Sequence, residues 1–114
     1  MALAELPAAE QVRLLDLVAY QEGAVVSRTL LKRPTGTVTL FAFDQGQGLS
    51  EHTAPFDALV HVLEGAAEIV IAGKPHQVSA DEMILLPALQ AHALTARTPF
   101  KMLLTMIRSA QGTE

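Results

Sequence analysis

Cysteine and tryptophan are absent from this sequence, and tyrosine occurs only once. Without cysteine the chain can have no disulfide, no thiolate metal ligand and no cysteine nucleophile. The shortage of large aromatic rings also disfavours sites that stack sugars or nucleobases. Metal or acid–base chemistry must therefore use carboxylates or the histidines, which are His52, His61, His76 and His92.

Long apolar runs and concentrated positive charge are missing as well. No apolar stretch approaches the roughly 20 residues that cross a bilayer, and residues 1–10 lack the basic and apolar segments of a secretory signal. The eight lysines and arginines are scattered along a chain of net charge −4 and form no patch for phosphates. We therefore expect a cytoplasmic protein that binds neither membranes nor nucleic acid.

What is present is a small and apolar domain. The length of 114 residues matches one domain. Half of the residues are apolar, 18% are charged and the mean hydropathy is +0.31, which indicates extensive burial. An apolar excess of this kind suggests that a partner subunit covers some of the surface, because obligate interfaces resemble a domain core. We expect a homodimer.

Short strands separated by turn residues follow from residue 24 onward. Apolar and β-branched runs alternate with Gly, Pro and Asp turns, as in all-β sandwiches and barrels. We expect residues 1–23 to form an N-terminal arm, either a loop with a short helical turn or an edge strand, and residues 109–114 to form a frayed tail. Strands are predicted at residues 24–32, 37–43, 58–63, 67–72, 76–78, 83–86, 92–96 and 100–107.

Two motifs occur in this pattern, one with Gly46, His52 and Gly65 and one with Pro87 and His92. They resemble the two signatures of the cupin superfamily. The first signature combines a glycine, a His-x-His pair, a glutamate and a second glycine, and Gly46, His52 and Gly65 occupy its slots. The second combines a glycine, Pro-x-Gly and a histidine, and Pro87 and His92 match it. The resemblance covers most of the chain and implies a single-domain cupin jelly-roll β-barrel over residues 24–108.

The departures from these motifs bear on the cofactor. In a complete cupin, three histidines and one glutamate hold Fe, Mn, Ni, Cu or Zn inside the barrel. Here Ala54 and Ala58 occupy the slots of a histidine and the glutamate, so only His52 and His92 carry over. Catalytic metal sites generally need three protein ligands. A divalent metal such as Fe, Mn, Ni or Zn stays possible, but we expect a metal-free pocket.

A third metal ligand would have to come from outside the motifs. Asp57 is close to His52 in the sequence, but strand alternation places their side chains on opposite faces. A bulge near Pro55 would reverse that register. Asp57 would then complete a facial triad with His52 and His92, a ligand set that suits Fe(II).

The leading hypothesis is a small-molecule-binding cupin of unassigned reaction. Small barrels commonly hold one ligand inside. Whether this chain is an enzyme stays open, because cupins include dioxygenases, isomerases, epimerases, decarboxylases, sensors and storage proteins. The pocket is predicted to be lined by His52, Ala54, Ala58, Val60, His92 and Met102.

Two alternatives stay beside this hypothesis. The first is a metal-dependent cupin enzyme, a dioxygenase or an isomerase, with a third ligand such as Asp57. The second is a non-catalytic dimeric interaction module, which predicts a filled barrel.

The other two histidines are expected away from the pocket. His61 lies between Val60 and Val62, so alternation predicts that it faces the opposite side of the sheet or a dimer contact. His76 follows a turn and is expected on the solvated surface.

Overall fold

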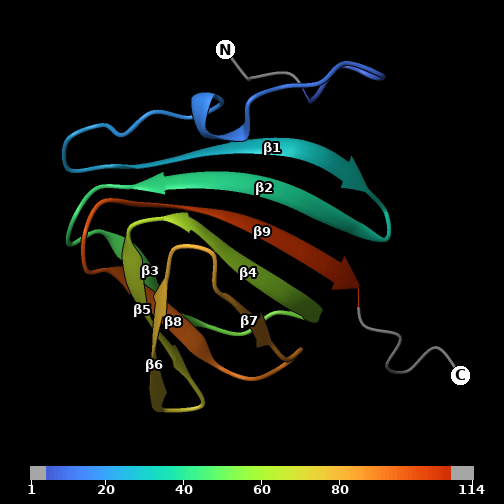
Figure 1. The fold of residues 1–114 in the computed structure, drawn as a ribbon. Coiled ribbons are helices and arrows are strands. Elements are labelled where there is room, and N and C mark those ends of the chain that lie inside the picture. The colour runs from blue at the N-terminus through green and yellow to red at the C-terminus, as the bar shows by residue number, and fades with distance from the viewer. Residues whose placement is uncertain (1–4, 109–114) are drawn as a thin grey trace, which may run out of the picture.

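Two antiparallel sheets packed face to face make up the fold (Figure 1). The computed structural model describes residues 5–108, so the predicted tail at 109–114 lies outside the described residues. A 3-10 turn, η1 at Leu14–Asp16, precedes the strands. The strands are β1 (Val25–Arg33), β2 (Gly36–Phe43), β3 (Gly48–His52), β4 (Phe56–Glu64), β5 (Ala66–Ile71), β6 (Lys74–Ser79), β7 (Met83–Leu86), β8 (His92–Ala96) and β9 (Phe100–Arg108).

The strand order is that of a jelly roll. One sheet has the order β1-β2-β9-β4-β7 and the other has β3-β8-β5-β6. Every connection from β2 to β5, and again from β6 to β9, passes from one sheet to the other. The all-β jelly roll predicted from the sequence is therefore confirmed. Within residues 5–108, no helix has the length and apolar character needed to cross a membrane.

The main core lies between the two sheets and follows from strand alternation. On β4, Ala58, Val60 and Val62 are buried, whereas the residues between them are only partly covered. Two fully buried rings, Phe43 of β2 and Phe100 of β9, stack with centroids 4.6 Å apart. Burial of such side chains stabilises a fold by about 1.5–3 kcal/mol each. The inner faces of both sheets are thus fixed by their apolar side chains.

One strand, β3, was not among the predicted ones. Gly48, Ser50 and Glu51 are exposed and carry no apolar signal, so its sequence has the composition of a turn. The strand forms because it pairs with β8, where Gly48 lies opposite Thr95. A side chain at Gly48 would place its Cβ 2.1 Å from the carbonyl oxygen of Leu94, so the close approach of these strands requires glycine.

The N-terminal arm covers part of the outer face, the side of the five-stranded sheet that carries Leu59, His61, Leu103 and Thr105. Leu6 N donates to the carbonyl oxygen of Leu30 at 3.0 Å, next to the bulge in β1. The arm packs on a second apolar cluster, in which the buried members are Val18, Leu30, Leu40 and Ala42. The region beside β7 and at the end of β9 stays uncovered by the arm, and Met83, Leu85 and Ile107 are exposed there.

Candidate functional site

Two histidines meet where β3 ends and β8 begins. His52 and His92 are cross-strand partners in the four-stranded sheet. Their ring centroids lie 4.4 Å apart, with an angle of 70° between the ring planes. His52 is exposed and His92 is half-buried, so the pair extends from the rim toward the interior. Pairing of β3 with β8 therefore creates a two-imidazole site from distant parts of the sequence.

Backbone carbonyls determine which nitrogen of each ring carries hydrogen. His52 Nδ1 lies 2.7 Å from the Ser50 oxygen, and His92 Nδ1 lies 3.1 Å from the Gln90 oxygen. A carbonyl oxygen can only accept a hydrogen bond, so each Nδ1 is the donor. In the neutral rings both Nε2 atoms then hold a free lone pair. These lone pairs can accept a hydrogen bond, take a proton or bind a metal.

The surroundings of His92 favour its neutral form. Burial lowers the pKa of His92 below its ordinary value of 6.5, and the nearby His52 lowers the pKa further. The hydrogen bond to the Gln90 oxygen acts in the opposite direction but does not outweigh burial. At neutral pH the His92 ring is thus uncharged, with Nε2 available as an acceptor or a base.

The histidine pair borders a cavity between the sheets, which we call the histidine cavity. Its volume is about 50 Å³. That exceeds the roughly 10–15 Å³ that one water requires, but falls well short of the roughly 300–1,000 Å³ of pockets that enclose a whole ligand. Its lining includes every residue placed there by the sequence analysis, namely His52, Ala54, Ala58, Val60, His92 and Met102.

Six further residues line the cavity and were not assigned to it from the sequence. They are apolar and come from both sheets: Leu49, Phe56, Leu86, Leu94, Leu104 and Met106. Strand periodicity indicates two of them, because alternation places Leu104 and Met106 on the same face of the last strand as Met102, as core or pocket wall. Leu49 could not be found this way, because β3 has no recognisable strand pattern.

The structure does not bring Asp57 to the histidines. The pairing of β4 with β9 runs without a register shift from Phe56 to Val62, so the bulge that would turn Asp57 inward is absent. Asp57 is exposed, and its Oδ1 accepts a hydrogen bond from Ala88 N at 2.9 Å. Across residues 5–108, no three side chains of His, Cys, Asp or Glu are grouped to hold a metal ion.

Comparison with known proteins decides the family. Residues 39–107 match the family model of the cupin domain, Cupin_2. The chain belongs to the cupin family. The resemblance inferred from the two motifs is therefore confirmed. A search of curated proteins finds no match.

Three solved structures are similar to this cupin over most of its length. A conserved protein of unknown function from Streptococcus pyogenes is 33% identical, covers 96% of both chains and superposes with a TM-score of 0.88. A cupin superfamily protein from Desulfitobacterium hafniense is 27% identical over 96% of this chain and 100% of its own, with a TM-score of 0.86. A Cupin 2 conserved barrel domain protein from Leptotrichia buccalis is 43% identical over 83% of this chain, with a TM-score of 0.81, and the match spans 46% of that protein.

The donor set of this cupin does not fit the metal centre of a complete cupin. Two imidazole nitrogens are available, but Ala54 and Ala58 contribute only methyl groups where the motif has a histidine and a glutamate. The remaining walls of the histidine cavity are apolar. Catalytic metal sites generally use three protein ligands, so these residues suit a metal-free pocket.

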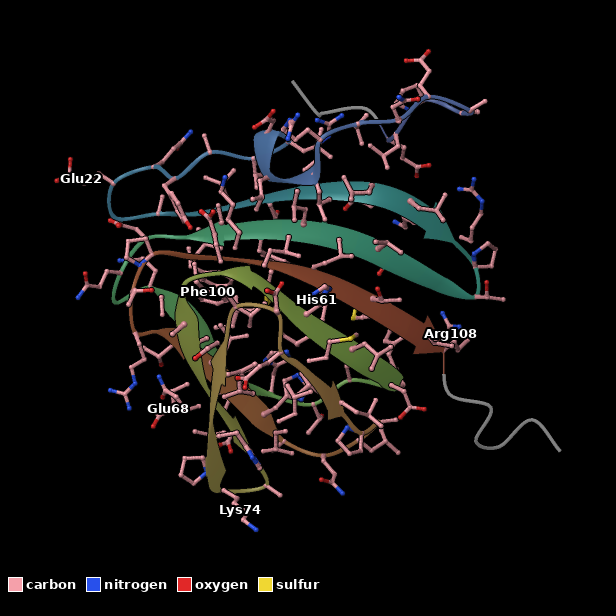
Figure 2. All side chains as sticks on the ribbon, in the orientation of Figure 1. Glu22, His61, Glu68, Lys74, Phe100 and Arg108 are labelled. Atoms are coloured by element: carbon pink, nitrogen blue, oxygen red, sulfur yellow. The ribbon has the colours of Figure 1, made fainter. Side chains whose placement is uncertain are left out.

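The other two histidines lie away from this site. His61 is on the outer face of β4, where its cross-strand partners are Met83 of β7 and Leu103 of β9 (Figure 2). His76 is on β6 opposite Ile69 and is partly exposed. Neither residue lines the histidine cavity. The chemistry of the cavity therefore depends on His52 and His92.

Proposed function

We propose that this cupin binds a small molecule, without a metal, at the histidine cavity. The observation that carries the proposal is that both Nδ1 atoms are held by backbone carbonyls, at 2.7 Å for His52 and 3.1 Å for His92. This arrangement leaves both Nε2 lone pairs for a ligand. A hydroxyl or N–H group of the ligand donates to these acceptors, and the apolar walls receive its hydrocarbon part.

The same geometry makes His92 the candidate general base. Its neutral form predominates at neutral pH because burial lowers its pKa. A base needs a free lone pair within hydrogen-bond reach of the proton that it removes. Nε2 of His92 carries such a lone pair, and an O–H or N–H group of a ligand in the cavity supplies a proton within its reach. The same nitrogen atom thus serves both binding and proton transfer. Conversion of a bound ligand to product distinguishes an enzyme from a protein that only binds the ligand.

A fragment screen followed by methyl NMR tests the proposal. Fragments are ranked by thermal stabilisation, and their binding is then mapped on protein with labelled alanine and methionine methyl groups. The expected result is shifts at Ala54, Ala58 and Met102, weakened in His52→Ala and His92→Ala and retained in the control His76→Ala. Hits that shift no methyl group of the histidine cavity would contradict the proposal and favour a filled, non-binding barrel.

We also propose that a second copy of the chain covers the free part of the outer face. One row of cross-strand neighbours spans all five strands, namely Leu85, Leu59, Thr105, Val38 and Leu31. Large apolar side chains are exposed on this face, with Leu31 at 42%, Leu85 at 50%, Ile107 at 54% and Met83 at 55%. Surfaces of this kind mark interaction sites.

Charge at the edges of this face favours a copy of the same chain as the occupant. The next row runs from Asp57 through Ile107 and Gly36 to Arg33, so its two ends carry opposite charges. A twofold axis parallel to the strands places Asp57 of each copy beside Arg33 of the other, as an isologous interface requires.

A cytoplasmic location and the lack of a nucleic-acid partner stay predictions from the sequence.

A further inference from the structure

A larger pocket adjoins the histidine cavity at the end of the barrel where β9 finishes. Its volume is about 380 Å³, and we call it the basic pocket because three of its seven lining residues are cationic: Lys32, Arg33, Pro34, Gly36, Thr37, Phe56 and Arg108. Phe56 lines both pockets. Figure 2 shows Arg108 at this end of β9, far from the β5–β6 hairpin that carries Lys74. The Phe56 side chain is therefore part of the wall of both pockets.

The register of the five-stranded sheet connects the two pockets along its inner face. One row of cross-strand partners runs through Lys32, Thr37, Met106, Ala58 and Leu86. The last three line the histidine cavity, and the first two line the basic pocket. Adjacent strands lie about 4.8 Å apart, so Lys32 is roughly 10 Å from Met106. One row of inner-face residues thus extends from the wall of the histidine cavity to Lys32 in the basic pocket.

Two of the three cations have donors available for a ligand. Arg33 is engaged, because its Nη1 lies 3.3 Å from Glu5 Oε1 and 2.6 Å from the Lys32 oxygen. The Lys32 ammonium has no acceptor within residues 5–108, although its backbone N–H donates to Glu5. The Arg108 Nε donates to the Pro34 oxygen at 3.1 Å, and the two terminal nitrogens have no acceptor in the described part of the chain.

Phe56 and Arg108 are in contact at this position. They are cross-strand partners on β4 and β9, and the guanidinium carbon lies 5.1 Å from the centre of the Phe56 ring. The ring and the bond to Pro34 hold the guanidinium in place, so little rotamer freedom is lost when a ligand binds. A guanidinium fork matches the oxygens of a carboxylate or a phosphate.

We infer that the ligand of this cupin is an organic anion with an extended apolar body. The inference rests on the function proposed above. The histidine cavity, at about 50 Å³, holds only one end of such a molecule, and the basic pocket, at about 380 Å³, holds the rest. The apolar body lies over Phe56 and Met106, and its oxyanion head binds Lys32 and Arg108. A carboxylate and a phosphate monoester share the chemistry required for that head.

Calorimetric titration with three matched probes tests the inference. Octanoate, octyl phosphate and octanamide share a chain and differ in the head group, and each is titrated at low ionic strength, where charge effects are largest. The expected result is that one or both anions bind at least about tenfold more tightly than the amide. Lys32→Met and Arg108→Met each remove most of that preference, and Lys74→Met on the β5–β6 hairpin keeps it. Circular dichroism checks that all three variants are folded.

The outcomes separate this inference from the proposed function. If octanoate alone shows the preference, the head is a carboxylate, and if octyl phosphate alone does, the head is a phosphate ester. Equal binding of anions and amide, or a preference that survives in both Lys32→Met and Arg108→Met, overturns the anion assignment. Failure of all three probes also overturns it. In these last cases the proposed function still stands if other fragments shift the methyl groups of the histidine cavity.

Discussion

His52 and His92 face each other across the β3–β8 pair, with their ring centroids 4.4 Å apart, and each ring binds a carbonyl two residues before it. The two corresponding local bonds give the rings the same tautomer, with hydrogen on Nδ1. Each ring is oriented by the backbone two residues before it, so the site is preorganised before any ligand enters. Preorganised acceptors lose little freedom on binding, which favours affinity.

The pH response of His92 is the first prediction. Because burial lowers its pKa in the folded state, the folded protein binds fewer protons here than the unfolded chain does. This contribution to stability is complete above the unfolded pKa of about 6.5 and is lost as pH falls toward the folded pKa. NMR titration should therefore show His92 ionising below the ordinary value, and His92→Gln should flatten the fall in stability with acid. A His92 pKa at or above its ordinary value would contradict the burial argument.

Metal content is the second prediction. Protein equilibrated with Fe(II), Mn(II), Ni(II) or Zn(II) and then dialysed should retain little metal, because the site offers only two imidazole ligands. The double variant Ala54→His, Ala58→Glu restores the motif ligands and should retain about one metal per chain, a stoichiometry expected for a complete ligand set. Elemental analysis measures both. Stoichiometric metal in the unmodified chain, abolished in His52→Ala, would reveal a third ligand and favour a metalloenzyme.

Stability of the cavity wall is the third prediction. Leu86 is 3% exposed and lines the histidine cavity, whereas Leu89 is 55% exposed in the following loop. Leu86→Ala should lower the free energy of unfolding by about 2–5 kcal/mol, because it removes buried methyl groups and enlarges a void. Leu89→Ala should change it by about 0.5 kcal/mol or less. Urea unfolding of both variants at one protein concentration measures the difference, and equal costs would place Leu86 outside the packed wall.

The oligomeric state is the fourth prediction. Leu85 lies on the proposed dimer face with 50% exposure, and Leu89 has similar exposure but lies outside the five-stranded sheet. Light scattering should give a dimer mass for the unmodified chain. Leu85→Lys should give a monomer, since a charge on an apolar interface is costly to desolvate, and Leu89→Lys should remain dimeric. A monomeric unmodified chain at micromolar concentration rules out the proposed pairing.

The anchor of the N-terminal arm supplies the fifth prediction. Tyr20 OH donates to Glu64 Oε2 at 2.6 Å, and Lys101 Nζ donates to the Leu15 oxygen at 2.7 Å. Tyr20→Phe removes the first bond and leaves the Glu64 carboxylate without its donor, so a loss of about 1 kcal/mol is expected. Hydrogen exchange should accelerate at Leu6 and Leu17 and stay unchanged on β5. Uniform acceleration instead would mean that the arm does not open separately from the barrel.

Much of the fold can be predicted from the sequence, because it depends on the alternation of apolar and polar residues along each strand. Alternation in residues 58–63 predicts that Val60 and Val62 face the core and that His61 does not, and the structure has this arrangement. The strand β3 is not predicted from the sequence, because Gly48, Ser50 and Glu51 show no alternation of apolar and polar residues. Its conformation comes from pairing with β8, and a side chain at Gly48 would disrupt that pairing. Local propensity alone contains no information about such a partner.

The sequence by itself determined every strand except β3, the jelly-roll family and the two histidines that occupy motif slots, because these depend on periodicity and spacing. Tertiary structure decided the rest. Asp57 faces outward because β4 has no bulge beside it, a matter of register with β9. Lys32 and Arg108 lie far apart in a chain whose basic residues are scattered, yet both line one pocket because β1, β2 and β9 are neighbours in one sheet. Strand pairing is a long-range interaction, so only the folded chain places these charges beside the histidine cavity.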